Sequence, residues 1–226
     1  HLLGPQRPRH ELLELRRQDR DRRSSNFLGP VVHHARARGH ILGQAGVHGV
    51  AHHVVGPLQA DDGDAWQALR EGRALLLLRH ANAPGLGDPP GFVLDDCSTQ
   101  RNLDEHGRAQ ARRWGELLRE KGLTRVRLLS SRWCRALDTA QQMALAPVEP
   151  LPALDSFFAS PTSERLQTAA LREALTELEP GEVAVLVTHQ VNITALTGIF
   201  PQSGEGLILA RPLAVAPKVL ARVAPP

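Results

Sequence analysis

The 226-residue sequence has no tyrosine, one methionine and only two cysteines, and these absences exclude several classes of protein. Cys97 and Cys134 are too few for a disulfide-rich scaffold or for a zinc site built from several thiolates. They could form one bridge if the protein is exported, a question that the sequence leaves open. No run reaches the eighteen apolar residues of a membrane span, so we expect no membrane partner.

Lysine is also nearly absent, since Lys121 and Lys218 are the only two. Arginine therefore supplies almost all of the positive charge, and a GC-rich coding sequence would produce the same bias. Residues 1–60 hold nine Arg against four acidic residues, whereas residues 61–226 hold eighteen Lys or Arg against twenty. The excess of positive charge belongs to the first segment alone. With no aromatic platform there beyond Phe27, we do not expect a nucleic-acid partner.

Residues 1–60 differ from the rest of the chain in composition. They contain eight of the eleven histidines, many Gly and Pro residues, and no sustained apolar period. We expect a basic His- and Arg-rich arm that is disordered or does not belong to the native protein. No Cys or carboxylate lies among six of these histidines, so we predict no metal site at His33, His34, His40, His48, His52 and His53. Residues 61–226 form the expected folded domain.

Strands alternate with helices in the expected domain. The apolar runs predict strands at residues 74–78, 126–129, 148–151 and 183–187, and extended pieces at 207–209 and 219–223. Predicted helices span residues 64–70, 104–121, 132–144, 161–178 and 192–197, and residues 82–100 form a loop. Asp104 and Gly122 are placed to begin and end the second helix, and Ser130 or Ser131 to cap the third. The alternation predicts an α/β fold with three α/β/α layers and a mostly parallel sheet.

Two of these strands end in a histidine. Leu75 to Arg79 leads into His80, and Val183 to Val187 leads into Thr188 and His189. An Arg-His pair is common by chance in such a sequence, but here it follows a buried strand. Ligands bind beyond the carboxyl ends of strands in open α/β sheets. We therefore expect both imidazoles at a functional rim of the sheet.

A third strand, residues 126–129, leads into a helix amino terminus that carries Arg132 and Arg135. Free amides and the positive end of the helix dipole favour anions there, and guanidinium groups match phosphate oxygens in pairs. The three strand ends together predict a phosphate site.

At this point the sequence resembles the histidine phosphatase superfamily, the group that includes phosphoglycerate mutase and acid phosphatases. The resemblance covers about residues 64–226 and rests on Leu78-Arg79-His80, on Ser131 to Ala140 with its Arg-Ala-x-x-Thr-Ala core, and on Thr188-His189. It implies a phosphoglycerate mutase-like fold and a metal-independent reaction without a cofactor. His80 would attack phosphorus and become phosphorylated, and the phosphoryl oxygens would be bound by Arg79, Arg135 and His189.

The resemblance also implies a proton donor after the third strand. In the family this donor is commonly a glutamate, which aligns about equally well with Asp155 and with Ser156. Asp155 is the acidic residue of the two and our first choice, and Glu205 is the reserve. Asn82 and Arg101 are further candidates for binding the substrate. Neighbouring cations should lower the pKa of His80, whereas His189 is expected to be protonated beside the bound anion.

We therefore expect a hydrolase of phosphomonoesters whose partner is a small phosphorylated substrate. The alternatives are a mutase-type phosphotransferase and a non-catalytic phosphate-binding relative. Ala81, where many relatives have Gly, and the following Asn82-Ala83-Pro84 favour the hydrolase over the mutase. A small exported branch of the family implies a periplasmic or secreted protein, although the sequence shows no signal peptide and a cytoplasmic location is the alternative. The physiological substrate and the oligomeric state do not follow from the sequence.

Overall fold

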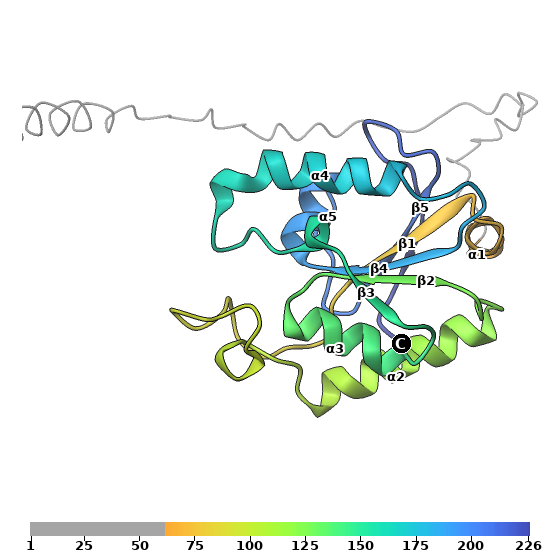
Figure 1. Cartoon of the computed structure of the whole chain (residues 1–226). Helices are drawn as coiled ribbons and strands as arrows, with labels where there is room; N and C mark the ends of the chain where they lie inside the picture. The colour runs from red at the N-terminus through yellow and green to blue at the C-terminus, as the bar shows by residue number, and fades with distance from the viewer. Residues whose placement is uncertain (1–61) are drawn as a thin grey trace, which may run out of the picture. The chain divides into compact units, whose positions relative to one another are not determined.

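The computed structural model describes residues 62–226, and the predicted arm of residues 1–60 lies outside them. Within the described residues the strands are β1 (Ala74–Arg79), β2 (Arg127–Ser130), β3 (Val148–Pro150), β4 (Ala184–Thr188), β5 (Gly206–Ala210) and β6 (Val219–Val223). The α-helices are α1 (Asp62–Arg70), α2 (Glu105–Glu120), α3 (Cys134–Met143), α4 (Glu164–Thr176) and α5 (Gln190–Thr197) (Figure 1). The predicted alternation of strands and helices is confirmed.

The six strands form one sheet in the order β3-β2-β4-β1-β5-β6. The first four are parallel to one another, β5 is antiparallel to β1, and β6 is antiparallel to β5 and so runs in the direction of the first four. The predicted mostly parallel α/β sheet is therefore confirmed, while the reversed direction of β5 was not predicted. Because β2, β4 and β1 are parallel neighbours, their carboxyl ends meet at one edge. Two hydrogen bonds join the residues that follow β1 and β2 to the end of β4: the backbone N–H of His80 donates to Thr188 O and that of Ser131 to Val187 O, each at 2.9 Å.

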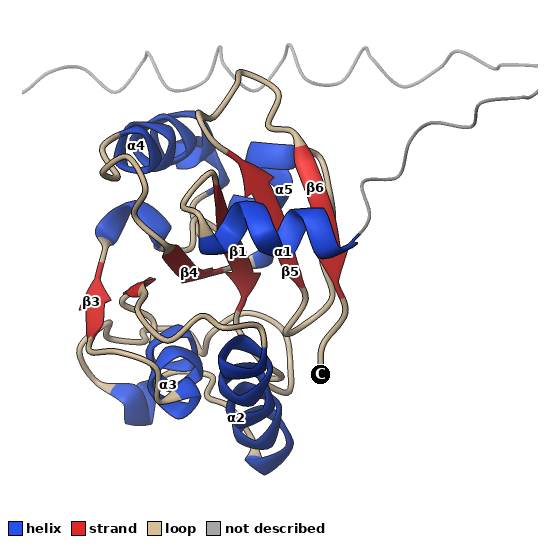
Figure 2. Cartoon of the chain, turned by 90° about the vertical axis from the view of Figure 1, so that its right-hand side faces the viewer, coloured by secondary structure: helices blue, strands red, loops and turns tan. Residues whose placement is uncertain are grey.

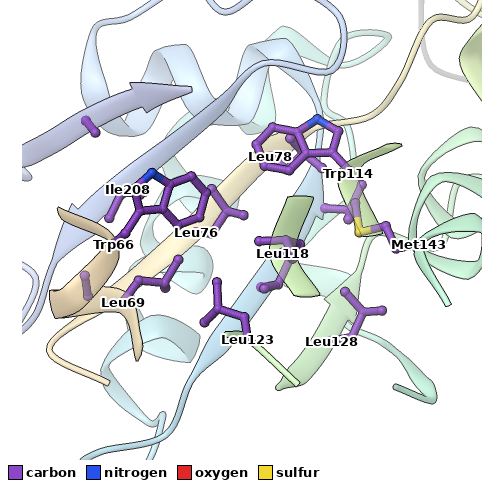
Figure 3. Packing of buried hydrophobic residues seen from close by; sticks show 14 of the residues in the cluster. Trp66, Leu69, Leu76, Leu78, Trp114, Leu118, Leu123, Leu128, Met143 and Ile208 are labelled. Atoms are coloured by element: carbon purple, nitrogen blue, oxygen red, sulfur yellow. The ribbon is translucent and has the colours of Figure 1, made fainter. Parts of the chain in front are cut away.

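Helices cover both faces of the sheet, which gives three layers (Figure 2). Leu76 and Leu78 of β1 pack with α1, α2 and α3 on one face, where Trp66, Trp114 and Met143 also lie (Figure 3). Leu75 and Leu77 point to the other face and pack with α4 and α5. Since side chains alternate along a strand, a strand covered on both faces must be apolar at every position. This explains the unbroken leucine run that leads to His80.

Helix α2 follows the prediction closely. The Asp104 side chain accepts a hydrogen bond from the Gly107 N–H, as expected of a helix cap. Trp114 is completely buried, and its ring N–H donates to Gly204 O at 2.7 Å. A Cβ on Gly107 would lie 2.0 Å from Asn82 O, so only glycine allows the helix to approach the chain just after His80 this closely.

Several predicted helix boundaries differ from the structure by two or three residues. Helix α3 begins at Cys134 rather than at Arg132, and neither Ser130 nor Ser131 is its N-cap; that position is Trp133, which makes no side-chain cap hydrogen bond. Helix α4 ends at Thr176, two residues before the predicted end, and a 3-10 turn at Pro161–Ser163 precedes it. Among residues 62–226, no helix combines the length and the apolar character needed to cross a bilayer.

Candidate active site

A small cavity of about 60 Å³ opens at the edge where β1, β4 and β2 end. The four residues predicted to converge, Arg79, His80, Arg135 and His189, all line it. Arg101 joins them from the position directly after the loop of residues 82–100, and the wall also includes the apolar side chains of Leu86, Phe158 and Val191. Residues far apart in the sequence thus meet at one point of the fold.

His80 presents an unprotonated ring nitrogen, Nε2, to the cavity. Its Nδ1 lies 2.8 Å from Ala81 O, and a carbonyl oxygen can only accept, so Nδ1 carries the proton. Nε2 then accepts from Nε of Arg135 at 3.3 Å. Burial lowers the pKa of His80 well below its usual value, and the charge of Arg135 lowers it further. The ring is therefore neutral near pH 7 and nucleophilic at Nε2.

His189 faces His80, with ring centroids 5.3 Å apart and planes at 64°. Its Nε2 lies 2.8 Å from the Ser131 hydroxyl, and its Nδ1 lies 3.4 Å from Nη2 of Arg135. Burial lowers the pKa of His189 well below its usual value, and the charge of Arg135 lowers it further. Without a bound anion both imidazoles are thus neutral, and protonation of His189 beside a bound anion stays a prediction.

The cavity concentrates positive charge. Burial lowers the pKa of Arg79 and of Arg101, and it lowers that of Arg135 to about 10, so all three side chains stay charged near pH 7. Nε of Arg79 is buried without a hydrogen-bond partner among the described residues. Three partly desolvated guanidinium groups around one small space would be stabilised by a bound dianion. The electrostatics of the cavity therefore favour phosphate.

Asp88, a residue that the sequence analysis missed, holds Arg135 in place. Its Oδ1 lies 2.8 Å from Nη1 of Arg135, and its Oδ2 accepts from the ring N–H of Trp133 at 3.1 Å. The backbone N–H of Arg101 also donates to Oδ1. Asp88 lies in a Gly- and Pro-rich loop without any periodic pattern, so no sequence signal marked it.

The loop and α3 are joined covalently by the Cys97–Cys134 disulfide, which answers the question that the sequence left open. The Gln100 side chain accepts the Cys134 N–H at 3.0 Å and so satisfies one free amide of α3. Thr139, from the Arg-Ala-x-x-Thr-Ala core, accepts the Ala81 N–H at 3.0 Å and donates to Arg135 O. The motif threonine thus ties the backbone after His80 to the helix that carries Arg135.

Three other predicted site residues do not line the cavity. Both carboxylate oxygens of Asp155 accept from Arg132, through its backbone N–H and its guanidinium group. Glu205 is paired with Arg222 at 2.6 Å and accepts the Gln202 N–H.

The Asn82 side chain donates to Asp104 at 3.1 Å, which connects the chain after His80 to the cap of α2. No carboxyl group is among the described residues that line the cavity. The predicted cations and imidazoles therefore converge, whereas the predicted donors and Asn82 lie elsewhere.

An unprotonated imidazole, surrounded by guanidinium groups at the carboxyl edge of an α/β/α sheet, defines a site suited to phosphoryl transfer through histidine. Residues 75–160 match the model of the histidine phosphatase superfamily (branch 1). This segment contains β1, the loop that follows it, and α3 with Arg135. Over this segment the chain is similar to the histidine phosphatase superfamily.

Solved structures with a similar fold include a phosphohistidine phosphatase SixA from Agrobacterium tumefaciens. The identity is 19%, the match covers 69% of this chain and 99% of that one, and the TM-score is 0.47. A mycobacterial glucosyl-3-phosphoglycerate phosphatase is 20% identical, with 65% and 96% covered and a TM-score of 0.45. A phosphoserine phosphatase from Entamoeba histolytica is 15% identical, with 67% and 96% covered and a TM-score of 0.49. Curated protein sequences gave no significant match.

Proposed function

We propose that the protein hydrolyses phosphomonoesters of small molecules through a phosphohistidine on His80. The observation that carries the proposal is the state of the His80 ring. Ala81 O fixes its proton on Nδ1, and burial together with the surrounding cations lowers its pKa and keeps Nε2 unprotonated. A nucleophile of this kind needs no separate base, and the same cations bind the group that it attacks.

In the first step the Nε2 lone pair attacks phosphorus, and the bond from phosphorus to the ester oxygen breaks. The leaving oxygen takes a proton from solvent, because no carboxyl group lines the described cavity. Arg79, Arg101, Arg135 and His189 bind the equatorial oxygens, where charge is concentrated during transfer. The hydrogen bond from Nδ1 to Ala81 O stabilises the positive charge that the phosphorylated ring acquires.

In the second step water attacks the phosphorus of phosphorylated His80. The bond from nitrogen to phosphorus breaks, its electron pair returns to Nε2, and inorganic phosphate leaves. Ala81, where many relatives have Gly, and the following Asn82-Ala83-Pro84 support hydrolysis over transfer of the mutase kind.

Turnover of para-nitrophenyl phosphate at mildly acidic to neutral pH tests the proposal. The wild-type protein should release para-nitrophenol, and a rapid acid-free quench should trap an acid-labile phosphoenzyme. His80→Ala should lose both signals, and His106→Ala, which changes an exposed histidine, should keep both. Turnover by His80→Ala at the wild-type rate would remove His80 from the mechanism.

A second candidate function is phosphate binding without turnover. It is favoured by one observation, namely that Asp155 and Glu205 are both engaged by arginines and away from the cavity. Calorimetry distinguishes the two functions: binding of inorganic phosphate that depends on Arg135, without para-nitrophenol release or phosphoenzyme, would establish the binding protein.

A further inference from the structure

The Ser131 hydroxyl connects a carboxylate to the second imidazole of the site. Its Oγ lies 2.8 Å from Nε2 of His189 and 3.2 Å from Oδ1 of Asp155. The backbone N–H of Trp133 also donates to it, at 3.3 Å. All three side chains are buried, with exposed fractions of 0% for Ser131, 3% for His189 and 7% for Asp155. The contacts form an unbroken line from Asp155 to His189.

The direction of the hydrogen bonds in this line follows from the chemistry of its ends. The ionised carboxylate of Asp155 only accepts, so the single Ser131 hydroxyl proton points to it. Nε2 of His189 must then be the donor to Ser131 Oγ. At the other side of the ring, the Arg135 guanidinium only donates, so Nδ1 must accept. Both ends independently assign the neutral ring to the tautomer with its proton on Nε2.

We propose that Asp155, acting through Ser131, is a positioning residue that holds His189 with its proton on Nε2 and its Nδ1 facing the phosphoryl group. When a phosphate dianion binds, Nδ1 gives up its contact with Arg135, takes a proton from solvent and donates it in a hydrogen bond to a phosphoryl oxygen. The Asp155 carboxylate then stabilises the imidazolium through Ser131, much as a buried aspartate orients and stabilises a catalytic imidazole elsewhere. The proposal rests on the proposed function, in which His189 binds the phosphoryl oxygens.

The other charged groups around His189 oppose protonation until the anion is present. Arg79 and His80 face it from the end of β1, Arg101 from the loop, and Arg135 from α3. Asp88 offsets part of the Arg135 charge but does not touch the ring. Asp155 is therefore the carboxylate connected to His189 through a hydrogen bond, and its connection passes only through Ser131 Oγ. This gives Asp155 a role different from the proton donor predicted from the sequence.

The ring nitrogens can be observed directly by ¹⁵N NMR of histidine-labelled protein, with and without inorganic phosphate. Wild-type His189 should show the Nε2–H tautomer alone and gain a second ring proton with phosphate. Ser131→Ala and Asp155→Asn should mix the tautomers or abolish the proton gain at the same pH. His80 is the internal control, because its Nδ1–H is fixed by Ala81 O and should stay unchanged in every variant.

Steady-state kinetics on para-nitrophenyl phosphate give the second readout. Ser131→Ala should lower kcat/KM by about tenfold, as loss of a supporting hydrogen bond behind a site residue commonly does. In a His189→Gln background the same substitution should cause no further loss, because it acts only through His189. Ser130→Ala, whose hydroxyl donates to Ser131 O and touches neither ring, is the matched control and should keep wild-type rates.

The proposal would be overturned if His189 gave the wild-type spectrum in both Ser131→Ala and Asp155→Asn. It would also be overturned if Ser131→Ala lowered kcat/KM by the same factor in the wild-type protein and in the His189→Gln variant. Failure of the proposed function looks different. In that case the wild-type protein would not turn over para-nitrophenyl phosphate, while the NMR tautomers would still report on the hydrogen-bonded line.

Discussion

Asp88 and Arg135 form an ion pair inside the protein, with Oδ1 2.8 Å from Nη1 and side chains that are only 8% and 3% exposed. The pair joins two segments that lie 47 residues apart in the sequence. Compared with a well-packed apolar pair, a buried ion pair adds little stability, but removal of one partner leaves the other charge uncompensated. Asp88 thus determines where the Arg135 guanidinium can lie between the two imidazoles.

Asp88→Ala should therefore destabilise the protein and misplace Arg135. Breaking a buried pair costs about 3 kcal/mol of the free energy of unfolding, which urea denaturation would measure. Turnover should fall as well, because Nε of Arg135 contacts Nε2 of His80. Asp95→Ala, at an exposed carboxylate of the same loop, is the control and should change neither quantity. Equal stability of the two variants would show that the ion pair does not hold the loop.

The Cys97–Cys134 disulfide joins the same loop to α3 next to Arg135. The two residues are separated by 37 positions, and closing a loop of that length in the unfolded chain corresponds to about 4 kcal/mol in the chain-entropy account. Reduction should lower the melting temperature and also lower turnover, since Asp88 and Arg101 lie on the released loop. A Cys97→Ala/Cys134→Ala variant should behave like the reduced protein and respond no further to reductant. A melting temperature that reductant leaves unchanged would contradict this account.

The buried histidines should make stability depend on pH. In the folded protein the pKa values of His80 and His189 lie well below the usual value, whereas in the unfolded chain they are about 6.5. Between these values the unfolded state binds more protons, so the free energy of unfolding falls as the pH falls below about 6.5. Each histidine contributes a slope of up to about 1.4 kcal/mol per pH unit until its folded pKa is reached.

Urea titrations at several pH values, in buffer without phosphate, check this slope. His80→Gln and His189→Gln should each reduce it, and His106→Gln, at an exposed histidine, should leave it unchanged. A slope that is the same in all three variants would mean that the two buried rings do not control acid stability.

The sequence predicted the position of the site better than its supporting contacts. Leu75 to Leu78 identify a strand covered on both faces, and such strands end where ligands bind, so Arg79 and His80 could be placed at the rim without coordinates. Arg135 and His189 followed by the same argument. All four line one cavity, as predicted.

The supporting contacts could not be predicted, because they depend on tertiary structure rather than on local pattern. Asp88 acts through a loop that is held by the disulfide and by the Gln100 side chain at the start of α3. Asp155 stood at the expected place in the sequence, after β3. Its carboxylate nevertheless turns toward Arg132 and Ser131, which no spacing rule indicates.

The carboxylates near the site also predict which phosphate esters react fastest. Asp88, Asp155 and Glu205 are each held by an arginine, and none of them lines the cavity. A general acid typically accelerates a reaction about 10²- to 10⁴-fold, and its help matters most for leaving groups that are strong bases. We therefore expect kcat/KM to depend steeply on the pKa of the leaving alcohol.

A series from para-nitrophenyl phosphate through phenyl phosphate to an alkyl phosphate checks this expectation. The alkyl ester should react about 100-fold more slowly than the nitrophenyl ester or slower still, because its alkoxide must leave without a donated proton. The rate of dephosphorylation of His80, measured with phosphoenzyme formed from any of these esters, should be the same, since the leaving group has by then departed. Equal kcat/KM values across the series, with chemistry shown to be rate-limiting, would mean that a proton donor enters the cavity when substrate binds. The effect of Asp88→Asn, Asp155→Asn and Glu205→Gln on the alkyl ester alone would then identify it.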